Sequence, residues 1–103
     1  MDIIKYKQLL TVSNPEKVRS NLNKYLGKLT VLYLSDRKNK KYFIIDPKNN
    51  LKIHFGDINF EDYTKHLDED RKSNYLKRSS KMIGNWKNNK FSPNNLSMNL
   101  LWK

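Results

Sequence analysis

The chain has 103 residues, of which 21 are basic and 10 are acidic, so its net charge is +11. This length predicts a single domain over residues 1–103, and the 12% of aromatic residues argues against disorder. The absence of cysteine excludes disulfides and thiolate metal sites and fits a reducing compartment. No apolar run is long enough to predict a transmembrane helix, and the first residues do not have the pattern of a signal peptide.

The charge is unevenly distributed along the chain. Residues 1–60 hold 12 basic and 5 acidic residues, residues 61–70 hold 1 and 5, and residues 71–103 hold 8 and 0. The frequent use of lysine and asparagine, as expected from an AT-rich genome, explains part of the basic excess. It does not explain a final third without any acid, so this third predicts a polyanionic partner.

The N-terminal part contains one clear helix signal. Residues 1–12 have apolar spacing that fits a short strand, a short helix or an arm that packs on a neighbour through Ile3, Ile4, Leu9 and Leu10. A helix is predicted over 15–26, because Asn14 suits the N-cap, Pro15 the first helical position and Gly27 the C-terminal end.

Three short strands are predicted next, over 29–35, 40–46 and 51–55, with polar turns between them. Strands joined in this way form an antiparallel meander. Alternation in the third strand places His54 on its polar face. The first turn is expected to present four cations, Arg37, Lys38, Lys40 and Lys41, at the tip of a hairpin.

The C-terminal half is predicted to be helical. A short helix or turn is expected near 59–67, and a longer helix is expected to start at Asp68 and to end at Gly84, with Tyr75, Leu76 and Ile83 facing inward. Ser92 and Pro93 can start a final short helix. The aromatic and apolar residues Trp86, Phe91, Leu100 and Trp102 either complete the core or, in part, form a stacking platform for bases.

These elements predict an α+β fold: a small three-stranded antiparallel sheet with an N-terminal helix and a helical C-terminal half. Residues 1–12 are a candidate arm, 15–58 hold the first helix and the meander, and 59–103 form the basic helical half.

The sequence offers little for catalysis. His54 and His66 could join nearby acids in a metal or nuclease site, but their spacing matches no recognised ligand pattern. The chain has no glycine-rich phosphate loop, no cysteine and no serine in a nucleophile elbow. We therefore expect no enzyme activity, no catalytic residues, no metal site and no cofactor.

Four stretches carry a resemblance to a known family: IHFG (53–56), FEDYTKH (60–66), DEDRKSNYLKR (68–78) and GNWKNNKFSPNNLSMNLLW (84–102). In this order they resemble a family of small basic proteins of nucleocytoplasmic large DNA viruses, the giant viruses. KKYFIID (40–46) and KVRSNLNKYLG (17–27) fit its longer members. The resemblance implies a viral protein in the host cytoplasm or viral factory, and in the virion. It supplies no catalytic residues.

The leading hypothesis is a non-enzymatic, virion- or genome-associated protein that binds nucleic acid, DNA rather than RNA, through its phosphates without sequence specificity. The residues expected to make these contacts are basic and lie in the hairpin tip and the tail: Arg37, Lys38, Lys40, Lys41, Arg71, Lys72, Lys77, Arg78, Lys81, Lys87 and Lys90.

The alternative is a minor capsid or cement protein that docks on an acidic protein surface such as capsid protein. Its contacts would come from the apolar residues of the arm and from Leu100, Leu101 and Trp102. A metal-dependent nuclease using the two histidines is a third hypothesis. The oligomeric state is left open.

Overall fold

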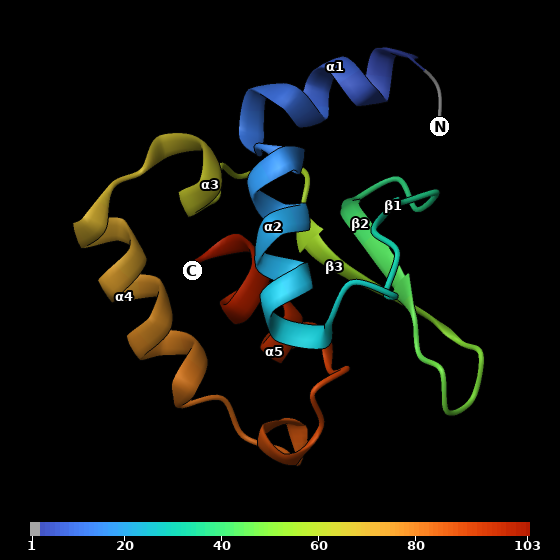
Figure 1. Ribbon diagram of the computed structural model, residues 1–103. Coiled ribbons are helices and arrows are strands. Elements are labelled where there is room, and N and C mark those ends of the chain that lie inside the picture. The colour runs from blue at the N-terminus through green and yellow to red at the C-terminus, as the bar shows by residue number, and fades with distance from the viewer. Residues whose placement is uncertain (1–2) are drawn as a thin grey trace.

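The computed structural model describes residues 3–103. The chain starts with two helices that meet at a corner (Figure 1). Helix α1 spans Ile3–Val12 and helix α2 spans Pro15–Leu26. The side-chain oxygen of Asn14 accepts hydrogen bonds from two backbone N–H groups in the first turn of α2, at 3.2 and 3.4 Å. The predicted helix and its N-cap are confirmed. The segment before it is a helix rather than a strand, and residues 1 and 2 lie outside the described range.

A three-stranded antiparallel sheet follows, in the order β1-β2-β3. Strand β1 spans Tyr33–Leu34, β2 spans Lys40–Ile45 and β3 spans Lys52–Asp57. With the helices on either side of it in the chain, this sheet confirms the α+β fold. β1 is much shorter than predicted: the segment before it is rich in β-forming residues, yet Leu29 is 98% exposed and does not pair with β2.

Both faces of the middle strand are covered. On one face Tyr42 lies opposite Phe55, and both are fully buried. On the other face the Phe43 ring stacks on Tyr33 and lies 5.2 Å from the ring of His54. His54 lies on the strand face that the alternation predicted, yet it is only 7% exposed. Alternation identified the face correctly, but it could not show that aromatic rings cover that face.

The second half of the chain is helical, as predicted. It consists of the short helix α3 (Tyr63–His66), the long helix α4 (Glu69–Ser80), a 3-10 turn η1 (Trp86–Asn88), α5 (Pro93–Leu96) and a π-helical turn η2 (Ser97–Leu101). Asp68 caps α4 and Ser92 caps α5 through side-chain oxygens, which confirms both predicted starts. None of the helices over residues 3–103 has the length and apolar character needed to cross a membrane.

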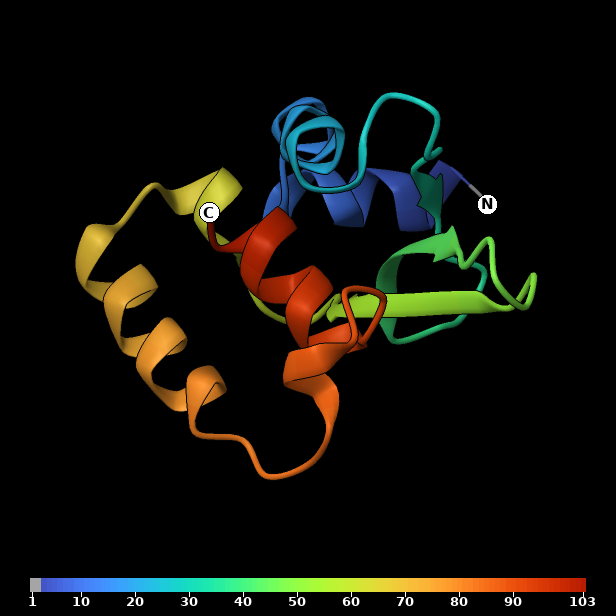
Figure 2. The same ribbon diagram turned by 60° about the horizontal axis from the view of Figure 1, so that its bottom comes forward.

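The continuous segment α5–η2 is the centre of the molecule, with α4 on one side and the sheet on the other (Figures 1 and 2). It packs on α2 and on β3. Leu96, Leu100 and Leu101 are at most 1% exposed and join Leu22 and Phe55 in the core. Burial of each such side chain stabilises the fold by about 1.5–3 kcal/mol. Leu100 and Leu101 are therefore core residues. The prediction that Leu100 completes the core is confirmed, and the alternative role of both leucines as partner contacts is wrong.

A glycine allows this central segment to approach the sheet. Gly56 in β3 has φ of +84°, a conformation that favours glycine. A Cβ atom at this position would lie 2.9 Å from Cδ1 of Leu101. The close packing of η2 against β3 therefore requires glycine, which has no side chain, at position 56.

Helix α4 is attached to this body by few contacts. Ser79 is its one buried residue, and Ile83 beyond its end is 99% exposed, in contrast to the prediction that it faces inward. The ring of Tyr75 stacks on Trp102 with centroids 4.3 Å apart, and the side chain of Asn94 donates to the carbonyl of Ser79 at 3.1 Å. α4 therefore lies on the body through an aromatic stack rather than through an apolar stripe.

Candidate nucleic-acid interface

The basic residues that the sequence singled out fall into separate groups in the structure. Arg37 and Lys38 lie in the exposed turn between β1 and β2. Figures 1 and 2 place this turn and α4 on opposite sides of the molecule. The ammonium group of Lys5 in α1 donates to the backbone carbonyls of Ser35 and Arg37, which braces the turn. The hairpin tip and α4 are therefore not one surface.

Lys41 does not belong to the hairpin tip. Its side chain is 2% exposed, and its Nζ lies 3.1 Å from Oδ2 of Asp62, which is 1% exposed. The same ammonium group donates to the carbonyl of Val12 at 3.4 Å. Burial lowers the pKa of Lys41, while the neighbouring carboxylate of Asp62 acts in the opposite direction. The prediction that Lys41 meets phosphates is wrong, because a buried and paired ammonium cannot reach them.

The Lys41–Asp62 pair belongs to a larger buried polar network that fastens the corner between α1 and α2. Oδ1 of Asp62 accepts from the backbone N–H of Thr64 at 3.0 Å, so Asp62 also caps α3. The Thr64 hydroxyl accepts from the backbone N–H of Asn14 at 3.0 Å, and the hydroxyl of Tyr42 donates to Oγ of Ser13 at 2.7 Å. This network joins the corner between α1 and α2 to β2 and α3, and its role is therefore structural.

Helix α4 carries one group of accessible cations. Arg71, Lys77 and Arg78 are exposed, as is Lys81 at its C-cap. Arg71 has one carboxylate partner, Glu61, at 3.7 Å. No carboxylate lies within 4.0 Å of the other three in the described part of the chain. Their positive charge is therefore not neutralised within the protein.

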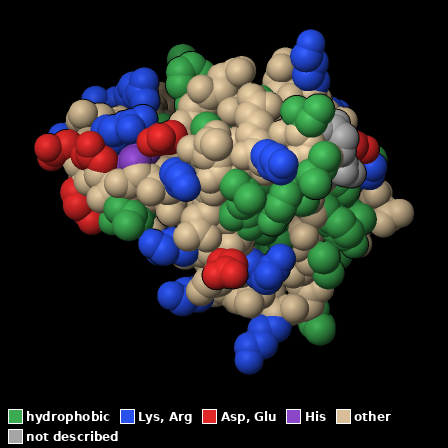
Figure 3. All heavy atoms as spheres, turned by 90° about the horizontal axis from the view of Figure 1, so that it is seen from above, with side chains coloured by type: hydrophobic (Ala, Val, Ile, Leu, Met, Phe, Trp, Pro, Cys, Tyr) green, Lys and Arg blue, Asp and Glu red, His purple; other side chains and the backbone are tan. Residues whose placement is uncertain are grey.

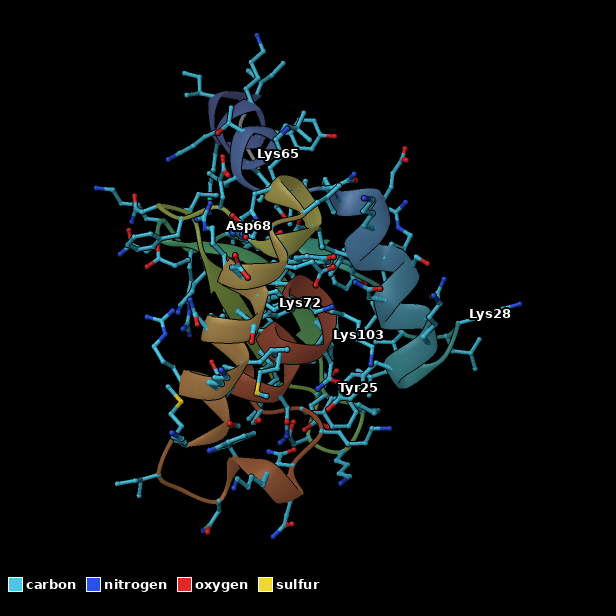
Figure 4. All side chains as sticks on the ribbon, turned by 90° about the vertical axis from the view of Figure 1, so that its left-hand side faces the viewer. Tyr25, Lys28, Lys65, Asp68, Lys72 and Lys103 are labelled. Carbon is cyan, nitrogen blue, oxygen red and sulfur yellow. The ribbon has the colours of Figure 1, made fainter. Side chains whose placement is uncertain are left out.

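Three other lysines on this side have aromatic neighbours. The ammonium of Lys72 lies 4.5 Å from the ring centre of Tyr63, and that of Lys87 lies 5.8 Å from the ring of Trp86. Lys90 donates to the carbonyl of Tyr25 at 3.1 Å, and the Tyr25 hydroxyl donates back to the carbonyl of Lys90 at 3.0 Å. Lys90 thus ties the C-terminal loop to α2. Figure 4 looks onto the α4 side, where Lys28 at the far end of α2 points away from the body.

A cleft of about 960 Å³ lies between α4, the α5–η2 segment and the end of β3. Its lining is predominantly apolar and includes Phe60, Tyr75, Trp86 and Trp102. Arg71, Asn74, Tyr75 and Arg78 reach it from α4 at helical spacing. Lys40 lines the cleft from the sheet side, together with the carboxylate-bearing residues Asp57 and Glu61. The cleft therefore combines aromatic surface with cationic groups.

Sequence reasoning did not find most of this cleft. Trp86 and Trp102 had been considered as stacking residues, but Phe60, Asn74 and Met82 had no assigned role. The spacing of 71, 74, 75 and 78 on α4 was the signal that one helix face carries both cations and an aromatic ring. The segment that packs opposite this helix face is set by the chain reversal at 81–92, and the spacing of residues within α4 does not reveal that reversal.

One other cluster has the residue types of a hydrolase triad. Oγ of Ser35 lies 2.8 Å from Nδ1 of His54, and Nε2 of His54 lies 3.7 Å from Oδ1 of Asp36. Ser35 is 0% exposed and its oxygen also accepts from the backbone N–H of Arg37, so no substrate can reach it. Over residues 3–103, no three histidine or acidic side chains gather as they would around a metal ion. The cluster holds the turn before β2 against β3.

Comparison with known proteins gives one family match. Residues 30–79, just under half of the chain, are similar to a family of unknown function (DUF5754). No curated protein and no solved structure matches the chain. The matched region holds the sheet, α3 and most of α4, including the buried Lys41–Asp62 pair and the cations Arg71 to Arg78.

Proposed function

We propose that this protein is a non-enzymatic nucleic-acid-binding protein that contacts the phosphate backbone with α4 and the loop after it. The observation that carries the proposal is the C-terminal half of α4, where Lys77, Arg78 and Lys81 are exposed and have no carboxylate within 4.0 Å among residues 3–103. A group of cations without internal partners attracts a polyanion and releases its counterions on binding. Binding is then independent of sequence and sensitive to salt.

The remaining predicted contacts have unequal support. Arg71 and Lys72 lie on α4, Lys87 lies in the turn η1 of the loop after it, and the exposed turn with Arg37 and Lys38 forms a second, separate contact. Lys40 lies at the cleft, Lys90 has its ammonium on the Tyr25 carbonyl, and Lys41 is excluded. The resemblance to proteins of large DNA viruses supports the viral genome as the nucleic acid, and we include this in the proposal.

The test compares two triple variants with equal change in charge. K77E/R78E/K81E changes α4, and K17E/R19E/K24E changes the exposed face of α2 as a control. Binding to a DNA duplex and to an RNA of equal length is measured across a salt series that starts at roughly 50 mM. Loss of three phosphate contacts should reduce the slope of log affinity against log salt by about 3.

We expect the α4 variant to lose at least about tenfold in affinity, while the α2 variant binds like the wild type. Both should unfold at the wild-type denaturant concentration, because the altered side chains are exposed. Equal affinity of the α4 variant and the wild type contradicts the proposal, and so does a wild type that binds neither nucleic acid at the lowest salt.

A second candidate function is the structural, capsid-associated role, and one observation favours it. Ile3 and Ile4 on α1 are 68% and 78% exposed, and Leu10 is 38% exposed, whereas Leu9 is buried in the core. Figure 3 looks onto the α1 side and shows apolar side chains gathered there, with mixed acidic and basic side chains at the opposite end. A stable oligomer, or copurification with capsid protein after nuclease treatment, would favour this role.

A further inference from the structure

We propose that the cleft beside α4 binds unpaired nucleobases, so that the preferred ligand is single-stranded nucleic acid. This inference rests on the proposed function, because the backbone of the same strand is held by the α4 cations. It adds a second site, the chemical class of its ligand and a preference between single and double strands.

The first argument is the amount of aromatic surface in the cleft. Phe60 is 66% exposed, and its ring opens into the cleft rather than into the core. Across the cleft, the half-buried Trp86 is held by a hydrogen bond from its Nε1 to the carbonyl of Met82 at 2.8 Å. The sequence analysis predicted that Trp86, Phe91, Leu100 and Trp102 complete the core or form a stacking platform. Of these four, Trp86 neither belongs to the core nor packs against it. An oriented indole and an open phenyl ring provide stacking surfaces for bases.

The second argument is charge at the border of the cleft. Arg71 and Arg78 both line it from α4. They are seven residues apart, which corresponds to about 10 Å along a helix. Asn74 and Tyr75 lie between them on the same face. A base that enters between the two guanidinium groups would have cations beside the phosphates on either side of it.

The third argument is an amide without a partner. Asn74 is exposed toward the cleft, and its side chain makes no hydrogen bond within residues 3–103. An amide can both donate to and accept from the edge of a base. The carboxylate-bearing Asp57 and Glu61 on the other wall would accept from exocyclic amines and would repel phosphates. The bases therefore point into the cleft, and the backbone follows α4 on the outside.

A duplex does not fit this arrangement, because its base faces are already stacked and its edges are paired. Single strands expose both. An acyl chain with an anionic headgroup would fill the apolar interior and reach an arginine, but it would leave the side-chain amide of Asn74 without a hydrogen-bond partner. The observations therefore favour the unpaired base over the lipid.

The experiment measures binding of the full chain to a single strand of about 12 nucleotides and to a duplex of the same sequence. The cleft variant is F60A/N74A, which replaces two exposed side chains and keeps every cation. The control is L29A/I83A, since Leu29 and Ile83 are 98% and 99% exposed and neither lines the cleft. Quenching of Trp86 and Trp102, the two tryptophans of the chain, reports on the cleft directly.

We expect the single strand to bind at least about tenfold more tightly than the duplex and to quench tryptophan fluorescence. F60A/N74A should lose most of this difference without losing affinity for the duplex, and the control should behave like the wild type. Equal binding of both ligands, with no effect of F60A/N74A, overturns the base site and leaves phosphate binding intact. If oleate quenches the tryptophans and the single strand does not, the cleft is a lipid site and the inference is wrong. If neither nucleic acid binds, the proposed function and this inference fail together.

Discussion

The buried corner and helix α4 use the same kinds of side chain for opposite purposes. In the corner, Lys41 and Asp62 are at most 2% exposed and are joined to each other and to the backbone by hydrogen bonds. On α4, Lys77 and Arg78 are exposed and have no acidic partner in the described chain. The first pair connects elements that are distant in sequence, whereas the second pair is available to a ligand.

This difference shows that a count of basic residues does not measure a binding surface. Lys41, Lys77 and Arg78 each contribute one positive charge to the net charge of +11. A buried lysine and its carboxylate must be kept together, because either one alone would be a charge without water around it. An exposed lysine can be replaced at little cost to the fold. Substitutions in the two regions should therefore act on different properties, stability in one and affinity in the other.

The largest expected effect is on stability, from D62N in the corner. Asparagine keeps the size and the N-cap function of the side chain but leaves the ammonium of Lys41 buried without a counter-charge. We expect the free energy of unfolding to fall by about 3–5 kcal/mol. Urea denaturation at neutral pH measures it.

The matched control is D68N, which changes the exposed N-cap of α4 in the same way. Because asparagine and aspartate cap helices about equally well, its effect should stay below about 0.5 kcal/mol. If the two variants are equally stable, the charge of Asp62 does not stabilise the corner, and the contrast drawn between the corner and α4 is wrong.

A smaller effect is expected from Y75A, which removes the stack that holds α4 to the body. Loss of an aromatic pair with centroids 4.3 Å apart should cost about 0.5–1.5 kcal/mol beyond the lost burial. Hydrogen exchange should show faster exchange of the α4 amides, while the β2 amides beside the corner keep their protection.

K77A on the same helix is the control for Y75A, since this side chain is exposed and has no ion-pair partner in the described part. Faster exchange throughout the sheet in Y75A would show that α4 and the body unfold as one unit. In that case α4 is not the loosely attached element that its few contacts indicate.

The smallest effect is expected from pH. Burial, followed by repulsion from Arg37, lowers the pKa of His54 below its usual 6.5, and Asp36 only partly opposes this. Burial also lowers the pKa of His66, with a contribution from Arg71. Below pH 6.5 the unfolded chain binds protons that the folded chain does not bind, so stability should fall as the pH drops from 6.5 through the folded pKa values. Urea midpoints at pH 7.5 and 5.5 measure this loss, and H54Q/H66Q should reduce it. An unchanged loss in that variant would assign the pH dependence to other groups.

Some of the fold could be predicted because its signals are local. The bounds of α2 follow from Asn14, Pro15 and Gly27, which act within one turn of the helix ends. The starts of α4 and α5 follow from Asp68 and Ser92 in the same way. Strands β2 and β3 were also located to within one or two residues, because their apolar patterns are bounded by polar turns.

The candidate site was only half predictable. The sequence pointed to α4 and its cations because a stretch without acids can be counted directly. It assigned Lys41 to the surface because Lys40 and Lys41 look alike in the chain, although only Lys41 meets Asp62. It left Leu100 open between the core and, together with Leu101, a partner, because a terminal apolar segment can pack on another chain or on its own chain, as it does here.

The sequence by itself therefore determined α2, β2, β3, the caps of α2, α4 and α5, and the excess of positive charge in the last third, since each depends on neighbours along the chain. Only the tertiary structure decided which charges are buried, which aromatic rings line a cleft, and that the hairpin tip and α4 lie apart. These outcomes depend on contacts between residues that are 20 or more positions apart, such as Lys41 with Asp62 and the carbonyl of Leu100 with Asn21. No local pattern specifies such partners, because the chain holds many side chains of the same type and only the packed fold brings one of them into contact with a given partner.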